Sequence, residues 1–205
     1  NSNVTLPDGT VVYLNAGSQL TYPSSFEKER EVWLLGEAYF HVSHDSEKPF
    51  LVTTEGYAVE VLGTKFNLSA YPSQKVIETV LVEGKVKLKE DGFQVIGDDI
   101  ILEPSQRAAF HRDSNVTHVS SVNVENYVSW HQGFLNAENL ELNRITKRLE
   151  LYYNIQIELQ KPILGITSIT GKLELNEDPD SVLIVLANTA SLELVKINKS
   201  KYIFK

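Results

Sequence analysis

Short alternating runs of apolar and polar residues fill the first part of the chain, from residue 1 to about residue 120. β-branched and aromatic residues are frequent in these runs, and turn signals separate them at intervals of about 8–12 residues. Alternation with a period of two is typical of strands that bury one face, and no segment here has a helical period. The pattern predicts an all-β domain, a jelly-roll-like sandwich or a roll.

Glycines mark the expected turns and kinks of this β-rich part. Asp8-Gly9 and the glycine at Gly84 each separate two apolar runs, as in a tight hairpin. Gly36 and Gly63 stand alone within strand-like sequence. Because the chain has no Gly-x-Gly-x-x-Gly pattern and no P-loop, these glycines indicate turns and bulges and do not indicate phosphate binding.

The parity of the apolar positions predicts which side chains face the core. One strand has its apolar residues at even positions, from Ala38 to Val42, and we expect these to point inward. Further along, the apolar positions change from odd to even between Val61 and Phe66. A one-residue bulge at Gly63 within one strand would keep all of them on the same face.

The pattern changes near residues 123–130, from strands alone to strand, helix and strand, repeated once. A helix is predicted over about Leu140 to Tyr152, with Asn139 as its N-cap. Asp178-Pro179 predicts the start of a second helix, with the aspartate as cap and the proline in the first turn. We expect residues 125–205 to form a small α+β domain in which two β-α-β units share one sheet, after an all-β domain at residues 1–124.

Charge and composition exclude several classes of function. The net charge is −8, with 17 acidic and 10 basic residues in 1–124, and 10 acidic and 9 basic in 125–205. Neither part has the basic stripe that nucleic-acid binding requires, and the acidic surface would be repelled by anionic lipid. Without cysteine there is no disulfide, thiolate metal site or cysteine nucleophile. No apolar run approaches the roughly 18 residues of a membrane span.

The chain opens with Asn1 and contains no methionine, so we expect it to be a piece of a longer protein, with any targeting or membrane segment upstream.

An ordered series of short motifs runs over about the first hundred residues. The series is Leu6-Pro7-Asp8-Gly9-Thr10, Leu14-Asn15-Ala16-Gly17-Ser18, Leu20, Tyr22-Pro23, Arg30, Val32, Leu34, Gly36-Glu37-Ala38-Tyr39-Phe40-His41-Val42, Pro49-Phe50, Val52, Val61-Leu62-Gly63-Thr64, Phe66-Asn67, Ala70-Tyr71, Leu81, Glu83-Gly84, Val86, Leu102, Pro104 and Gln106. This series resembles the FecR family of anti-sigma regulators.

The second part of the chain resembles the C-terminal domain that often follows in these regulators, which is similar to the short N-terminal domain of secretins and TonB-dependent receptors. The matching residues are Trp130, Gly133, Phe134, Leu140, Tyr152 and Ile155. Together the two resemblances cover nearly the whole chain.

The resemblance implies the sensing part of a membrane-bound anti-sigma regulator, located in the periplasm and tethered to the inner membrane. It implies a contact with the signalling domain of a TonB-dependent outer-membrane receptor. It implies contact with a sigma factor only through a cytoplasmic segment missing from this chain, and with the membrane only through a missing upstream helix. We expect no catalysis and no cofactor, and the sequence assigns no partner-binding residue.

Two groups of ionisable residues nevertheless suggest chemistry. His41 and His44 lie three apart, and a turn at His44-Asp45-Ser46-Glu47 could gather metal ligands, although a solvated acidic loop explains the same residues. Glu37 could act as a catalytic carboxylate with Glu83 as partner, giving a hydrolase. The alternative is that Glu37 bonds the backbone or Arg30.

Aromatic residues and sheet edges suggest binding. Trp33, Tyr39, Phe40 and Trp130 could stack on sugars, which would make the chain an extracytoplasmic carbohydrate- or surface-binding module, or they could simply be core. The segment Lys199–Lys205 has lysines around Tyr202–Phe204, as exposed edge strands often do, and a partner strand could add there.

Four tripeptides match the glycosylation pattern, a tripeptide that is common by chance. They are Asn3-Val4-Thr5, Asn67-Leu68-Ser69, Asn115-Val116-Thr117 and Asn198-Lys199-Ser200.

Overall fold

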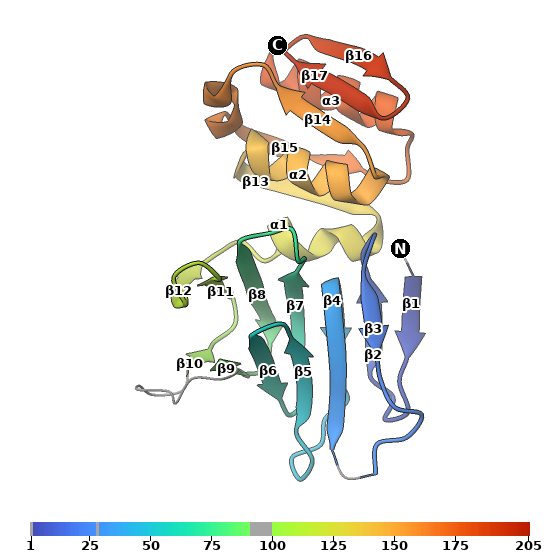
Figure 1. The fold of residues 1–205 in the computed structure, drawn as a ribbon, viewed down its shortest axis with the longest axis vertical. Helices are drawn as coiled ribbons and strands as arrows, with labels where there is room; N and C mark the ends of the chain where they lie inside the picture. The colour runs from blue at the N-terminus through green and yellow to red at the C-terminus, as the bar shows by residue number, and fades with distance from the viewer. Residues whose placement is uncertain (1, 28, 91–99) are drawn as a thin grey trace. The chain divides into compact units, whose positions relative to one another are not determined.

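The computed structural model describes residues 2–27, 29–90 and 100–205 (Figure 1). The chain divides into two compact units, Asn1–Val124 and Glu125–Lys205. The fold is mostly β, with a sandwich-like sheet in the first unit and a smaller α+β arrangement in the second, which confirms the fold class at this level. No helix among the described residues has both the length and the apolar character needed to cross a bilayer.

The described residues of the first unit form one sheet of 12 strands. Their order is β10-β9-β6-β5-β4-β7-β8-β11-β12, with β2 and β3 also paired to β4, and β1 paired to β2. The strands are β1 (Ser2–Thr5), β2 (Val11–Leu14), β3 (Gln19–Thr21), β4 (Arg30–His41), β5 (Phe50–Thr54), β6 (Tyr57–Val61), β7 (Lys65–Ala70), β8 (Val76–Glu83), β9 (Val86–Glu90), β10 (Ile100–Leu102), β11 (Gln106–His111) and β12 (Val116–Ser121).

The long strand β4 belongs to both halves of this sheet. Its first part pairs with β3 and β5, and its second part pairs with β2 and β7. Gly36 lies at the change of partners with a φ of 100°, which favours glycine. A Cβ there would stand 2.5 Å from the Ser18 hydroxyl oxygen, so this position has no room for a larger residue.

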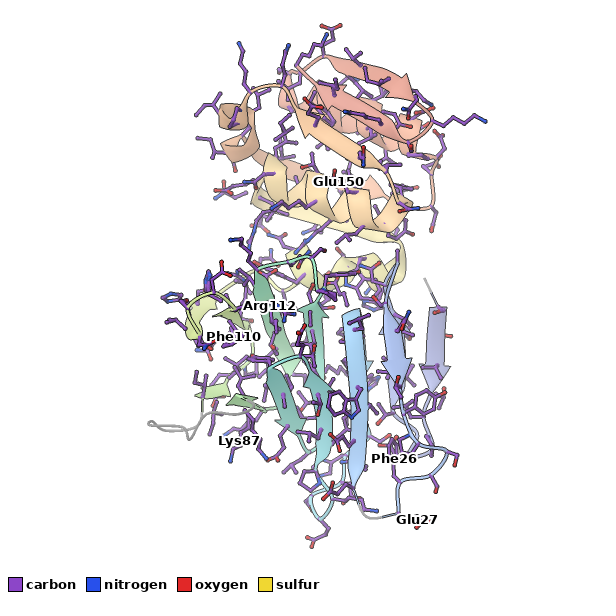
Figure 2. The ribbon with its side chains drawn as sticks, viewed as in Figure 1. Phe26, Glu27, Lys87, Phe110, Arg112 and Glu150 are labelled. Carbon is purple, nitrogen blue, oxygen red and sulfur yellow. The ribbon has the colours of Figure 1, made fainter. Side chains whose placement is uncertain are left out.

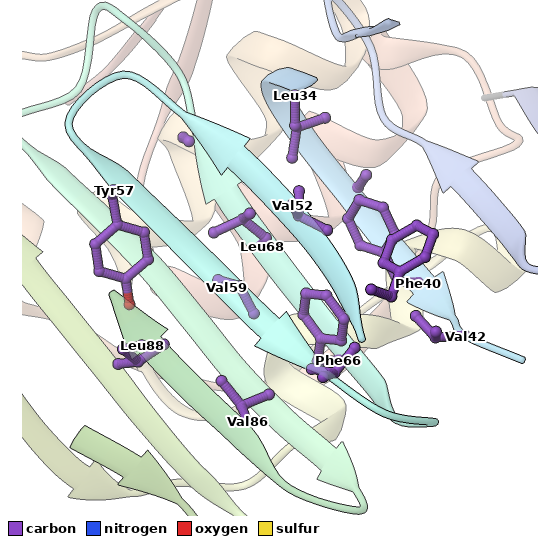
Figure 3. Packing of buried hydrophobic residues seen from close by; sticks show 14 of the residues in the cluster. Leu34, Phe40, Val42, Val52, Tyr57, Val59, Phe66, Leu68, Val86 and Leu88 are labelled. Carbon is purple, nitrogen blue, oxygen red and sulfur yellow. The ribbon is translucent and has the colours of Figure 1, made fainter. Parts of the chain in front are cut away.

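The core lies between the two halves of the sheet (Figure 3). Phe40 stacks on Phe66 with ring centroids 4.9 Å apart, and lies 6.4 Å from Phe50 of the other half. Tyr57 stacks on Phe110, which is labelled in Figure 2, with ring centroids 5.4 Å apart. Burying each such ring contributes roughly 1.5–3 kcal/mol, so the Phe40–Phe50 and Tyr57–Phe110 contacts hold the two halves face to face.

Ala38, Phe40 and Val42 are all buried in this core, which confirms the parity prediction. The predicted turn glycines Gly9 and Gly84 have φ values of 84° and 95°.

The predicted bulge at Gly63 is wrong. Strand β6 ends at Val61 and pairs with β5 and β9, whereas β7 begins at Lys65 and pairs with β4 and β8. The chain therefore crosses from one half of the sheet to the other over residues 62–64. Apolar parity changes there because two separate strands face the core from opposite sides. Gly63 is required for close packing, since a Cβ would lie 2.6 Å from the backbone and the ring of His44.

The second unit places two helices between two small sheets. Strands β13 and β15 form one sheet, and the other has the order β14-β17-β16. Helix α2 contacts β13 and β14, and helix α3 contacts β15 and β16, so each helix bridges both sheets. The elements are α1 (Glu125–Val128), η1 (Ser129–Gln132), β13 (Phe134–Glu141), α2 (Leu142–Tyr153), β14 (Gln156–Leu159), η2 (Pro162–Ile166), β15 (Ser168–Glu174), α3 (Pro179–Ala190), β16 (Leu194–Asn198) and β17 (Lys201–Phe204).

Strand, helix and strand follow one another twice, but the prediction that both copies share one sheet is wrong. The two strands of each copy lie in different sheets, because β13 pairs with β15 while β14 and β16 flank β17. Helix α2 begins at Leu142, and its N-cap is Glu141 instead of Asn139. Asn139 has a φ of 52° and lies at a register shift within β13. Asp178 caps α3 as predicted, accepting a hydrogen bond from the Ser181 amide at 3.0 Å.

Candidate functional site

The motif residues Asp8 and Arg30 form a buried ion pair inside the first unit. Arg30 is 2% exposed, and its Nη1 donates to Asp8 Oδ2 at 3.0 Å and to the Ser43 carbonyl oxygen at 2.8 Å. Its Nε donates to the Lys48 carbonyl oxygen at 2.7 Å. Asp8 also accepts from the Thr10 amide and hydroxyl. The Arg30 guanidinium thus links the turn at Asp8-Gly9 to the loop over residues 43–48, and its role is structural.

Glu37 is the centre of a second buried polar cluster. Its two carboxylate oxygens accept hydrogen bonds from Asn15 Nδ2 and Asn67 Nδ2, both at 2.8 Å. Its amide donates to the Ser18 hydroxyl at 2.8 Å. Of the two alternatives for Glu37, backbone or Arg30, the Arg30 alternative is wrong, because the ion-pair partner of the Arg30 guanidinium is Asp8. The carboxylate therefore orients side-chain amides from β7 and from the loop after β2.

Tyr71 lies beside this cluster, with its hydroxyl donating to the Ala16 carbonyl oxygen at 2.9 Å. Burial raises the pKa of the Tyr71 phenol, and the negative charge of Glu37 raises it further, because both disfavour the phenolate. The hydroxyl stays protonated at neutral pH and acts as a fixed donor.

The structure does not bring Glu37 and Glu83 together. Glu37 is opposite Ser69 on β7, whereas Glu83 is opposite Lys65 and forms an ion pair with it at 2.7 Å. The two positions on β7 are four residues apart, or about 13 Å along the strand. Carboxylate pairs that hydrolyse glycosides stand roughly 5–10 Å apart. Glu83 is exposed, and its hydrogen bond with Lys65 lowers its pKa.

His44 and Asp45 lie in the predicted turn, but Asp45 bonds the backbone. Its Oδ1 accepts from the amides of Glu47 and Lys48 at 2.9 and 3.1 Å, and these bonds lower the pKa of the carboxyl. His41 and His44 are both exposed. Within residues 2–27, 29–90 and 100–205, no group of three or more His, Cys, Asp or Glu side chains could hold a metal ion.

The four aromatic residues do not form one stacking platform. Phe40 is buried in the core and Tyr39 is 8% exposed on the opposite face of β4. Trp33 is 53% exposed, and Trp130 belongs to the other unit. Among the glycosylation tripeptides, Asn67 is buried and bonded to Glu37, so it is inaccessible.

The predicted exposed edge at residues 199–205 is wrong. Strand β17 is the central strand of its sheet, parallel to β14 and antiparallel to β16. Tyr202 and Phe204 are buried. The lysines of this segment therefore flank a core strand and do not guard an edge.

A groove of about 310 Å³ lies beside β15 and the first half of α3. Its lining includes Lys172, Glu174, Glu177, Ser181, Val182 and Val185. Val185 and the neighbouring Ile184 are each 51% exposed. The only sequence signal for this groove is Ile184-Val185, two exposed apolar residues next to the buried residues Val182, Leu183, Leu186 and Ala187 of α3.

Two family models match the chain, one within each of its two units. The model described as FecR protein matches residues 1–87, and the model described as FecR, C-terminal matches residues 134–204. The chain belongs to the FecR family. In this FecR-family chain, Asp8, Arg30 and Glu37 lie within the first match, and the groove beside α3 lies within the second.

Solved structures agree with this assignment. Two crystal structures of a candidate anti-sigma factor from Parabacteroides distasonis ATCC 8503 are similar to this FecR-family chain, each at 28% identity. One has a TM-score of 0.83 and covers 100% of this chain and 93% of that chain. The other has a TM-score of 0.81 and covers 99% and 92%. No curated protein matches the chain.

Proposed function

We propose that this FecR-family chain is the periplasmic sensing part of an anti-sigma regulator. It receives a signal by direct contact with the signalling domain of a TonB-dependent outer-membrane receptor. It passes the signal to a sigma factor through a cytoplasmic segment outside this chain, and a membrane helix tethers it to the inner membrane.

The observation that carries this proposal is similarity over essentially the full length of the chain. Both FecR models match, and the candidate anti-sigma factor of Parabacteroides distasonis is similar in sequence and in fold across both units. The polar clusters support a binding role over catalysis, because the carboxylate of Glu37 and the guanidinium of Arg30 are engaged by internal partners. We therefore propose that the chain is not an enzyme and needs no cofactor.

Signalling by contact requires that the receptor domain favours one state of the regulator over another. A coupling free energy of about 1–3 kcal/mol is typical of such linkage. Reversing a 1:99 population to 99:1 would require about 5.5 kcal/mol of differential binding.

Calorimetry with the signalling domain of the receptor encoded beside this chain tests the proposal. We expect saturable 1:1 binding, and much weaker binding to the signalling domain of an unrelated receptor. In cells, substitutions that abolish binding should abolish the substrate-dependent activity of the cognate sigma factor in a reporter assay. Absence of binding to every receptor signalling domain of the organism would contradict the proposal.

A second candidate function, binding of carbohydrate, is favoured only by the exposure of Trp33 at 53% and of Tyr22 at 39%. Aromatic faces of this kind can stack on sugar rings. A glycan array on which the unaltered protein binds nothing would remove this candidate, and binding lost in Trp33→Ala would support it.

A further inference from the structure

Strand β15 has a free edge. On one side it pairs with β13, and no other strand of the described residues pairs with it. The Leu175 amide donates to the Gly133 carbonyl oxygen at 2.8 Å. Because hydrogen-bonded and non-hydrogen-bonded pairs alternate in an antiparallel ladder, the main-chain N–H and C=O of Lys172 and Glu174 point away from β13.

Helix α3 provides an apolar wall beside this edge. Val182 and Val185 are three residues apart on α3 and line the groove together with Lys172 and Glu174 of β15. A strand laid along the free edge would point alternate side chains toward this wall. The groove of about 310 Å³ is large enough for such side chains.

The charges at the groove favour a basic occupant. Glu174 and Glu177 line it, both are exposed, and within the described part of the chain neither carboxylate has an ion-pair partner. Lys172 also lines the groove, but within the described residues it forms no ion pair with either carboxylate, and its ammonium lies over the Phe134 ring, 3.6 Å from the centroid. By contrast, the Asp180 carboxylate on α3 is paired with Lys196.

We propose that the free edge of β15 and the groove beside α3 bind one extended segment of the receptor's signalling domain by strand addition. The segment alternates apolar and polar residues, with apolar side chains over Val182 and Val185. A lysine or arginine of the segment pairs with Glu174 and Glu177. This inference rests on the proposed function and names the surface that performs it.

Amide hydrogen exchange of the full chain, with and without the signalling domain of the receptor encoded beside it, tests the inference directly. We expect the Lys172 and Glu174 amides to exchange fast in the free protein and at least about tenfold more slowly in the complex, because each gains a main-chain partner. Fast exchange at both amides in a saturated complex would overturn the inference.

Substitutions separate the main chain from the side chain. Lys172→Pro removes the outward N–H at an edge position where proline is tolerated, and we expect its affinity to fall by about tenfold or more. Lys172→Ala keeps the N–H and serves as the matched control, with affinity close to that of the unaltered protein. Equal affinities for the two variants would contradict strand addition.

A charge test does not depend on the folding of the proline variant. The double variant Glu174→Lys, Glu177→Lys should bind at least about tenfold more weakly. The control Glu193→Lys, which changes an exposed carboxylate outside the groove, should bind normally.

Binding by all variants alike would overturn the inference while leaving the proposed function in place. No binding by the unaltered protein would overturn both. Protection of these amides by self-association alone would show that a second copy is the occupant and would also overturn the inference.

Discussion

The two units of this chain treat charge in opposite ways. The first unit buries a guanidinium and a carboxylate, Arg30 and Glu37, and satisfies each with several internal hydrogen bonds. In the second unit, the buried polar residues of the described chain are all uncharged: Asn126, Ser129 and Thr146. Its carboxylates at Glu174 and Glu177 stay exposed beside an open strand edge. The comparison teaches that the first unit uses buried charged groups to fix its own loops, whereas the second keeps Glu174 and Glu177 at the surface, where the proposed partner segment would meet them.

The strongest test of this comparison is removal of the buried guanidinium. Arg30→Met should lower the free energy of unfolding by about 3–5 kcal/mol, because Asp8 and the carbonyl groups around it lose their partner in a buried site. Urea denaturation followed by circular dichroism measures the change. Arg112→Met is the control, because among the described residues Arg112 forms its ion pair with the exposed Glu55. The comparison fails if the two variants are equally stable.

Substitution of the buried carboxylate should have the next largest effect. Glu37→Gln retains the shape but presents an amide to Asn15 or Asn67 where an acceptor was, so we expect a loss of about 1.5–3 kcal/mol. Urea denaturation again provides the measurement. Glu83→Gln, at an exposed ion pair with Lys65, should change stability little. A stable Glu37→Gln protein would mean that the cluster does not need the charge.

The same variant should change the titration of Tyr71. The Tyr71 pKa is raised in the folded protein, so its contribution to stability is complete below the usual tyrosine pKa of about 10 and is lost as the pH rises above it. Glu37→Gln removes one of the two causes and should lower the Tyr71 pKa while leaving it above the usual value. Ultraviolet titration of the phenolate, with Tyr71→Phe to assign the signal, measures the shift. An unchanged pKa would contradict the electrostatic coupling.

The smallest expected effect is at the cap of α3. Asp178→Ala should lower the unfolding temperature slightly, because the Ser181 amide loses its acceptor. The Ser181 hydroxyl and amide lower the pKa of Asp178, so the capping contribution is present above the usual aspartate pKa and is lost as the pH falls through the lowered value. Asp178→Asn, which caps without titrating, should remove this pH dependence. Thermal unfolding across the acidic range provides the measurement.

Local patterns predicted much of the fold because they report burial. Alternation identified Ala38, Phe40 and Val42 as core, and Asp178-Pro179 marked the first turn of α3, since both signals depend on neighbouring residues only. The mostly β first part and the smaller α+β second part followed from the same reasoning.

Local patterns do not determine which strands pair, and the incorrect predictions arose from that. The change from odd to even apolar positions around Gly63 fits one bulged strand, and it fits equally well two strands that face each other across a core. Only the pairings of β6 and β7 distinguish these two arrangements. In the same way, lysines beside Tyr202 suit an edge strand or a central strand with exposed ends.

Local sequence patterns also could not predict the candidate site. The open edge of β15 depends on the absence of a neighbouring strand from the described sheet, which no short segment encodes. The buried partners of Glu37 come from positions 22 and 30 residues away. The sequence instead suggested Arg30 or Glu83 as partners, and both are bonded elsewhere, Arg30 to Asp8 and Glu83 to Lys65.

The central place of β17 has a consequence for biogenesis. Strand β17, residues 201–204, is synthesised after β14 and β16, yet those two strands join one sheet only through it. Every described strand of the first unit precedes residue 122, so that unit can complete its sheet before β17 is synthesised. A chain cut or stopped just before Lys201 would therefore lack the central strand of the three-stranded sheet. Its second unit would remain incompletely folded, although fewer than ten residues would be missing from the sequence given.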